Sequence, residues 1–251
     1  MKFICNLLLV FLLNRTRLAP RAWFAKFSST ISRLGYIVSH YDSALFLHCT
    51  DKPTIFLLLY VVDMIITGDD LDGTQELQNF LSQQFEMKDL GQLNYFLGLK
   101  ITHSTDGLCI TQAKYASELL SQARLSDSKT IDTLVELNTH LIPSREKPLS
   151  NPSLYRCLVG SLIYLTVTYL DISYVVHQVS QYLSALRSTH YATVLHILQY
   201  LKGTLFHGLF YSTNSPLILL AFSNTDWAGD PTDRRSTTAY CFLLGSSLIS
   251  W

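Results

Sequence analysis

The sequence predicts a fold that mixes α-helices with β-strands, because two kinds of apolar periodicity recur along its 251 residues. Apolar residues return at helical spacing in three stretches, residues 20–35, 172–186 and 189–203. Shorter apolar runs at 44–50 and 55–62 are typical of strands, and the second run shows no polar alternation. We therefore expect 55–62 to be a strand that is buried on both faces.

Boundary signals define the first two helices. In residues 20–35, Pro20 suits the first helical position and Gly35 can end the helix. A further helix should begin at Asp72, which together with Gln75 resembles an N-terminal capping pair.

Strand signals surround this second helix. Asp63 starts a tight connection from the preceding apolar run into 64–68. Residues 93–112 resemble a hairpin that turns at Asp106–Gly107, a dipeptide typical of tight turns, and 114–123 return to a helical pattern.

The second half of the sequence begins with a polar stretch, 126–153, that is the best candidate for a linker. The apolar stretch 158–176 is interrupted by Asp171, so we interpret it as a buried core helix rather than a membrane span. Three strands should follow, at residues 208–212, 217–227 and 237–251.

Composition indicates a folded, rather apolar protein, with 48% hydrophobic and 15% charged residues. Nineteen basic residues balance nineteen acidic ones, so no net charge favours nucleic acid or an acidic partner. The spacing of the eight histidines indicates no metal site. The five cysteines are far apart in the sequence, which favours reduced, buried thiols: Cys5, Cys49, Cys109, Cys157 and Cys241.

The first seventeen residues have an unusual composition. One lysine precedes an apolar run that resembles a signal peptide, but no small-residue cleavage pattern follows it. The run is also shorter than the ~20 residues that a membrane-spanning helix needs. We expect residues 1–17 to be an atypical N-terminus, whose composition is typical of a reading-frame or splice artefact.

A short motif carries the chemical signal. Tyr60, Val61, Val62 and Asp63 stand between two apolar strands, so that one acid lies at the tip of a predicted hairpin. Polymerases present paired carboxylates in this way, because two Mg²⁺ ions ~3.5–4 Å apart need oxygen ligands from more than one residue.

This motif resembles the Y-V-D-D tetrad of copia-type retrotransposon reverse transcriptases, with valine at the first aspartate. The resemblance extends in the family's order over about residues 18–251, and the chain is also similar to uncharacterised copia-derived proteins of plant mitochondria. The blocks that carry it are APRAWFAKF, SHYDSALF, MKDLGQLNYFLGLKI, YRCLVGSLIYLT, DISYVV, YLKGT, DWAG and DRRSTTAYCFLLG.

The resemblance implies an α+β fold: a partial reverse-transcriptase palm and thumb, a helical connection and a truncated ribonuclease H-like sheet. It implies the following segments: 1–17, the atypical N-terminus; 18–125, the partial palm and the start of the thumb; 126–153, the linker; 154–205, the helical connection; and 206–251, the ribonuclease H-like part.

Three departures from the family pattern bear on activity. Val62 replaces an aspartate that the resemblance implies is a principal metal ligand, and it leaves only Asp63 as a vestigial ligand at the tip. The family's other metal-binding aspartate has no counterpart, because the first acid of the chain is Asp42. Asn224 replaces the acid expected two residues before Asp226 in the ribonuclease H-like part, and amides bind Mg²⁺ less well than carboxylates.

Neighbouring charges do not replace these ligands. Asp69 and Asp70 should lie ~20 Å from Asp63 along an extended strand, and we interpret them as a solvated turn. The resemblance places Tyr60 and Lys88 at a nucleic-acid surface, with a solvated turn as the alternative for Lys88 and the adjacent Asp89. We interpret the charged segment 233–235 as a hairpin loop, with a contact to a nucleic-acid backbone as the alternative.

The sequence therefore predicts a degenerate fragment of a copia-type reverse transcriptase and ribonuclease H that is catalytically inert. Mg²⁺ is the family's cofactor, but we expect none bound here, and the family's partner is an RNA or DNA template-primer. The alternatives are a weak polymerase that works with a partner subunit and a domesticated nucleic-acid-binding module. We expect an intracellular protein with no membrane segment and no obligate protein partner, and the resemblance makes the mitochondrion one candidate compartment.

Overall fold

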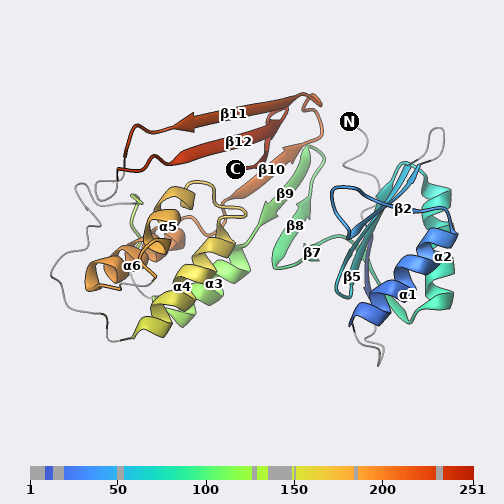
Figure 1. Cartoon of the computed structure of the whole chain (residues 1–251), viewed down its shortest axis with the longest axis horizontal. Helices are drawn as coiled ribbons and strands as arrows, with labels where there is room; N and C mark the ends of the chain where they lie inside the picture. Colours follow the sequence, from blue (N-terminus) through green and yellow to red (C-terminus); the bar gives the residue numbers. More distant parts are fainter. Residues whose placement is uncertain are drawn as a thin grey trace. The chain divides into compact units, whose positions relative to one another are not determined.

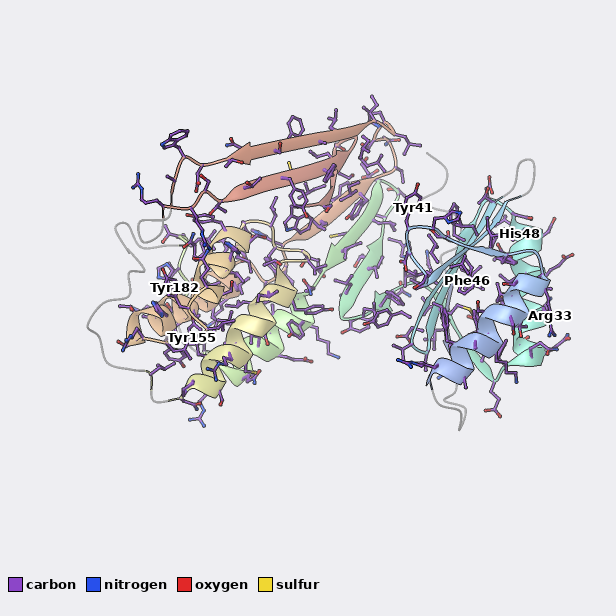
Figure 2. The ribbon with its side chains drawn as sticks, in the orientation of Figure 1. Arg33, Tyr41, Phe46, His48, Tyr155 and Tyr182 are labelled. Atoms are coloured by element: carbon purple, nitrogen blue, oxygen red, sulfur yellow. The ribbon has the colours of Figure 1, made fainter. Side chains whose placement is uncertain are left out.

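The computed structural model describes residues 9–13, 20–49, 54–125, 129–134, 149, 151–183, 186–229 and 234–251. The chain divides into two compact units, the first ending at Phe96 and the second running from Leu97 to Trp251. Each unit has its own hydrophobic core, to which Phe46 and Tyr155 respectively belong (Figures 1 and 2). The division falls inside 18–125, so the predicted palm-like segment does not coincide with one compact unit.

A six-stranded antiparallel sheet forms the first unit, with two helices against one of its faces (Figure 1). The strand order is β2-β3-β4-β5-β1-β6. Helix α1 (Pro20–Arg33) confirms the helix predicted from residue 20. The other elements are α2 (Leu71–Gln84), β1 (Leu9–Leu13), β2 (Ile37–Val38), β3 (Leu45–Cys49), β4 (Thr54–Tyr60), β5 (Asp63–Gly68), β6 (Met87–Gln92) and β7 (Tyr95–Phe96).

Part of the atypical N-terminus belongs to the sheet. Strand β1 pairs on one side with β5 and on the other with β6, and Val10 is buried. Its run of large apolar residues, LVFLL, suits a strand inside a sheet because such residues pack well on a pleated surface. Residues 9–13 of the atypical N-terminus are therefore part of the sheet, while 1–8 and 14–17 lie outside the described residues.

Strand β4 is buried on one face only, which corrects the prediction of two-sided burial. Ile55, Leu57 and Leu59 are buried against α1 and α2, whereas Phe56 and Tyr60 on the other face are exposed. Side chains alternate between the faces of a strand, and here both helices cover the same face. The continuous apolar run hid this alternation because exposed and buried positions are equally apolar.

The β4–β5 hairpin closes through a two-residue turn, Val61–Val62, with Tyr60 paired to Asp63. Val61 adopts φ 54°, a backbone conformation that β-branched residues rarely adopt. A positive φ at the first turn position is typical of II′ turns, where glycine is the usual residue. The turn therefore stores strain within the motif itself, at Val61.

Helix α2 is capped two residues earlier than the capping pair predicted. Asp70 is the N-cap, and its Oδ1 accepts a hydrogen bond from the Gly73 backbone N–H at 2.8 Å. Asp72 lies in the first turn instead. Three acids lie within four residues, at 69, 70 and 72, and only the end of β5 decides which of them can adopt the extended backbone of a cap.

The second unit contains the predicted hairpin, here β8 (Leu99–His103) and β9 (Gly107–Thr111). Strand β10 (Gly208–Ser212) pairs antiparallel with β9, with Leu209 opposite Ile110. The structure therefore joins a strand that we predicted within the ribonuclease H-like segment to a hairpin that we predicted within the palm and thumb.

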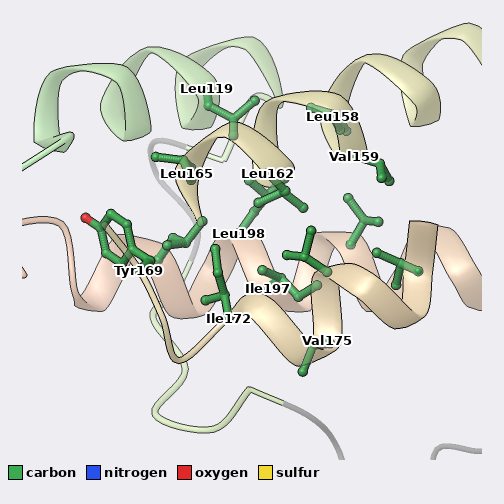
Figure 3. Packing of buried hydrophobic residues seen from close by; sticks show 14 of the residues in the cluster. Leu119, Leu158, Val159, Leu162, Leu165, Tyr169, Ile172, Val175, Ile197 and Leu198 are labelled. Atoms are coloured by element: carbon green, nitrogen blue, oxygen red, sulfur yellow. The ribbon is translucent and has the colours of Figure 1, made fainter. Parts of the chain in front are cut away.

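Four helices form the core of the second unit, and their apolar faces meet around Leu162 and Leu198 (Figure 3). They are α3 (Ala113–Gln122), α4 (Pro152–Leu165), α5 (Ser173–Ser180) and α6 (Ser188–Gly203). No helix of the described residues combines the length and the apolar character that crossing a bilayer would require.

The stretch 158–176 is not one helix, which corrects that prediction. Helix α4 ends at Leu165, α5 starts at Ser173, and Asp171 lies in the turn between them. The Asp171 carboxylate accepts hydrogen bonds from the Ile172 N–H and from the Tyr200 hydroxyl, at 3.0 and 2.5 Å. The second bond is the main reason that the pKa of Tyr200 rises to about 12, ahead of burial. The Asp171 side chain therefore links this turn to α6 by a hydrogen bond.

The last part of the chain has one strand more than predicted. Strands β11 (Leu219–Thr225), β12 (Thr238–Leu244) and β13 (Ser247–Ser250) form a three-stranded sheet in that order. Residues 237–251 therefore fold as a hairpin rather than as one strand. Gly245 makes the turn with φ 60°, a conformation that glycine adopts without strain.

The predicted linker 126–153 is partly packed where the structure describes it. Leu134 and Leu149 contact the helical core, and the Thr133 carbonyl lies 2.8 Å from His196 Nε2 on α6. Helix α4 already begins at Pro152. The positions 126–128, 135–148 and 150 lie outside the described residues.

Replacing Val61 by glycine should stabilise the protein. Glycine removes the ~1–2 kcal/mol cost of the left-handed conformation. Its greater freedom in the unfolded chain costs ~0.5–1 kcal/mol, so we expect the free energy of unfolding to rise by about 0.5–1 kcal/mol. Denaturant unfolding of the full chain measures this gain. The matched control is Val62→Gly, which should destabilise because Val62 packs against the core. A destabilised Val61→Gly protein would show that the turn is not strained.

Replacing Asp70 by alanine should destabilise the protein by about 1 kcal/mol, because the Gly73 N–H loses its capping acceptor. Asp72→Ala should cost less, since Asp72 contributes only through the helix dipole in the first turn. Thermal unfolding of both variants compares the two acids. A larger loss of stability for Asp72→Ala than for Asp70→Ala would show that Asp72 is the cap, as the sequence predicted.

Candidate functional site

Three of the predicted site residues lie on the open face of the first sheet. Strand pairing sets Tyr60 opposite Asp63, Asp63 opposite Leu12, and Leu12 opposite Lys88. Residues directly opposite each other in antiparallel strands point to the same face. Tyr60, Asp63 and Lys88 therefore share the face that α1 and α2 leave uncovered, and about 10 Å separates the backbones of β5 and β6.

Val62 lies on the other side of the hairpin tip. Its side chain is half-buried and packs against the core cluster between the sheet and the helices. The neighbouring Asp63 begins β5 on the open face, opposite the 51%-exposed Tyr60. The two positions that the family motif fills with acids are thus directed differently, and valine suits the apolar side that it occupies.

The remaining acids near the sheet are engaged elsewhere. Asp69 and Asp70 lie at the far end of β5, about 20 Å from Asp63 at ~3.3 Å per residue. Asp69 accepts a hydrogen bond from the Thr54 N–H, and Asp70 caps α2. Both residues lie in the connection between β5 and α2, where the turn was predicted: Asp69 is exposed, and Asp70 is half-buried as the N-cap.

Lys88 and Asp89 point to opposite faces of β6. The Asp89 carboxylate accepts hydrogen bonds from Gln78 on α2 and from the Gly91 N–H, at 2.8 and 2.7 Å. It is consequently held on the helix-covered face. Lys88 lies on the open face with Asp63, where a positive charge opposes a bound cation.

The residues at the hairpin tip do not fit a pair of Mg²⁺ ions. Such ions lie ~3.5–4 Å apart and need several oxygen ligands, which carboxylates supply best. Asp63 is the carboxylate at the tip, valine has no lone pair to donate, and Lys88 shares the face. Among the described residues, no group of three or more His, Cys, Asp or Glu side chains could hold a metal ion.

The second predicted site has a similar deficit. Asn224 lies on β11, and its side-chain oxygen accepts a hydrogen bond from the Thr225 N–H at 2.9 Å. The Asp226 carboxylate accepts from the Thr237 N–H at 2.8 Å, so it helps to close the β11–β12 connection. Of the predicted charged loop, Asp233 lies outside the described residues, while Arg234 lies in that connection with φ 59°.

Cysteine and histidine have structural surroundings where they are described. Cys109, Cys157 and Cys241 carry free thiols as predicted, but none is buried, and Cys157 is exposed. The prediction of buried thiols is therefore wrong for these three. The buried His190 stacks on Tyr182 with ring centroids 4.1 Å apart, as expected for a residue on an ordinary packed helix.

Sequence reasoning missed the open face of the first sheet. Phe56 and Tyr60 are exposed on this face, and the half-buried Leu58 lies between them on the same strand. The run 55–62 contains no polar residue that would mark an outward position. The charged Asp63, which follows this run, and Lys88 on β6 are the signals that this face meets solvent.

Comparison with known proteins agrees with this geometry. The family model "Reverse transcriptase (RNA-dependent DNA polymerase)" matches residues 10–136. The retrovirus-related Pol polyprotein from transposon RE1 of Arabidopsis thaliana is 36% identical over 93% of the chain, which spans 16% of that polyprotein. The Pol polyprotein from transposon TNT 1-94 of Nicotiana tabacum is 34% identical over 93% of the chain, which spans 18% of it.

A shorter relative matches over most of its own length. The uncharacterized mitochondrial protein AtMg00810 of Arabidopsis thaliana is 42% identical over 78% of this chain and 82% of the relative. No solved structure matches the chain. The open-face sheet, the motif at its hairpin tip and these matches together show that the chain belongs to the reverse transcriptase family of copia-type retrotransposon Pol polyproteins.

Proposed function

We propose that this chain is a catalytically inert reverse transcriptase fragment. The observation that carries the proposal is the position of Val62, which stands where the family motif has a carboxylate and packs its half-buried side chain against the core cluster. DNA synthesis transfers a phosphoryl group, and its catalysis depends almost entirely on positioning and on neutralising charge with metal ions. Asp63, beside Lys88, cannot supply the ligands for that chemistry by itself.

The second proposed site points the same way. A ribonuclease H-type reaction also needs divalent ions held by several carboxylates. Asn224 offers an amide oxygen that is already bonded to the backbone, and Asp226 is engaged by the Thr237 N–H. We propose that this part of the chain is inert as well. A weak polymerase that works with a partner subunit would need a partner that supplies these carboxylates.

Residual binding of a nucleic-acid duplex is a second candidate function, because one specific observation favours it. Tyr60 and Phe56 are exposed on the same face that carries Lys88, in a chain with no net charge. Exposed aromatic rings can stack on bases or sugars, and a lysine can contact a phosphate. A template-primer would then rest on the open face without being extended. We propose an intracellular location, with the mitochondrion as one candidate, from the relatives alone.

Val62→Asp should not create a polymerase. The new carboxylate would start from the core side of the hairpin tip, so it would not converge with Asp63 on shared ions. Half-burial of an unpaired polar group should also destabilise the protein by about 1–3 kcal/mol. Primer extension on an RNA template with Mg²⁺ or Mn²⁺ measures the first effect, and denaturant unfolding measures the second.

The control for this experiment is Val62→Ala, which removes side-chain contacts without adding a ligand. We expect wild type, Val62→Asp and Val62→Ala to show equal background incorporation. Template-dependent synthesis by the wild type above the alanine variant, or rescue by aspartate, would overturn the proposal of inactivity.

Lys88→Gln should weaken binding to an RNA–DNA hybrid and reduce its salt dependence. Loss of one phosphate contact should lower the slope of log K against log salt by about 0.7–0.9. The matched control is Lys100→Gln, which removes an exposed lysine from β8 in the second unit. Equal changes for both lysines, or no binding by the wild type, would exclude the open face as the contact surface.

A further inference from the structure

A stretch inside the connection between α3 and α4 is attached to helix α6. It comprises residues 129–134, which we call the strap, and these residues form neither helix nor strand. Nε2 of His196 on α6 lies 2.8 Å from the Thr133 carbonyl oxygen. A carbonyl oxygen can only accept, so the imidazole N–H donates this hydrogen bond. One end of the strap is thereby joined to the middle of α6.

The other end of the strap lies against the last residue of α6. A Cβ atom at Gly203 would be 3.7 Å from Cβ of Thr130 and 3.9 Å from the Ile131 carbonyl oxygen, which are ordinary van der Waals distances. His196 and Gly203 are separated by about 10 Å along a helix, and three residues of open chain reach the same length. The strap therefore follows the last two turns of α6 in the antiparallel direction.

The strap buries little of its own surface. Its residues 129, 130, 132 and 133 are exposed, while Ile131 and Leu134 are half-buried. Leu134 packs against the helical core, whose own residues are buried. A segment with few buried apolar contacts opens at a free-energy cost far below that of global unfolding. Opening of the strap should therefore be cheap compared with unfolding of the four helices.

We propose that the strap is releasable: it leaves α6 and docks again while the four helices stay folded. When docked, it pins the α3–α4 connection to α6 and covers the side of this helix that carries His196 and Gly203. When released, the whole connection acts as one long tether and that side of α6 is uncovered. Loop-closure entropy changes only slowly with loop length, so the contacts with α6 decide the balance between the two states. The proposal concerns the second unit and is independent of the proposed lack of polymerase activity.

Gly203 is the position at which the proposal is tested with the least disturbance. Its backbone belongs to α6, so leucine should favour the helix, while the new side chain would enter the space of Thr130 and Ile131. The matched control is Gly160 in α4, where a Cβ atom would meet no atom of the described residues within 4 Å apart from its own helical turn. The same change therefore reaches the strap at only one of the two glycines.

Limited trypsin digestion of the full chain, followed by mass spectrometry, measures release as the rate of cleavage after the exposed Lys129. When opening and closing are fast, this rate follows the population of the released state. Gly203→Leu should raise the rate at least about 10-fold, because its side chain overlaps the docked strap. Gly160→Leu should leave it unchanged. His196→Ala should raise it about 5-fold, as expected for the loss of one hydrogen bond.

Cleavage after Lys114 in α3 reports whether the helices themselves open, and it should be the same in all variants. Neither glycine variant should lower the temperature of thermal unfolding, since leucine is the better helix former. Equal cleavage after Lys129 in wild type and Gly203→Leu would overturn the proposal. So would an equal increase in Gly160→Leu, or a parallel rise of cleavage after Lys114.

Discussion

Tyr60 pairs directly with Asp63 across a two-residue turn, and this register determines which side chains of β4 and β5 reach the helices. A shift by one residue would exchange the faces of a strand, because successive side chains alternate. Ile55, Leu57 and Leu59 meet α1 and α2 only in the observed register. The core therefore holds the hairpin in place, even though Val61 must adopt an unfavourable backbone conformation to close it.

The same register separates the two positions of the motif that carry acids in the family. Asp63 starts β5 on the open face, while Val62 turns toward the apolar cluster. A carboxylate at position 62 would sit against apolar surface unless ions and ligands compensated its charge. Valine needs no such compensation, so the fold gains apolar contact where the family places a metal ligand. Stability and metal binding make opposite demands on this position.

The two units differ in how completely they cover their sheets. In the first unit, helices cover one face and the edges are short or charged. In the second unit, the helices form a core among themselves around Leu162 and Leu198, and β11 remains exposed on both faces. Apolar residues on an uncovered sheet are a feature of interaction surfaces.

Sequence alone determined the local features of this protein. Pro20, the Asp106–Gly107 turn and the helical stripes identified α1, the β8–β9 hairpin and the helical core, because these signals act over a few residues. The resemblance to the family motif likewise implied that Val62 stands in place of an acid. Tertiary structure decided what depends on distant partners: the strand at Leu9–Leu13, the one-sided burial of β4 and the pairing of β10 with β9. An apolar residue looks the same in sequence whether a helix covers it or not, so only the packed fold distinguishes core from open surface.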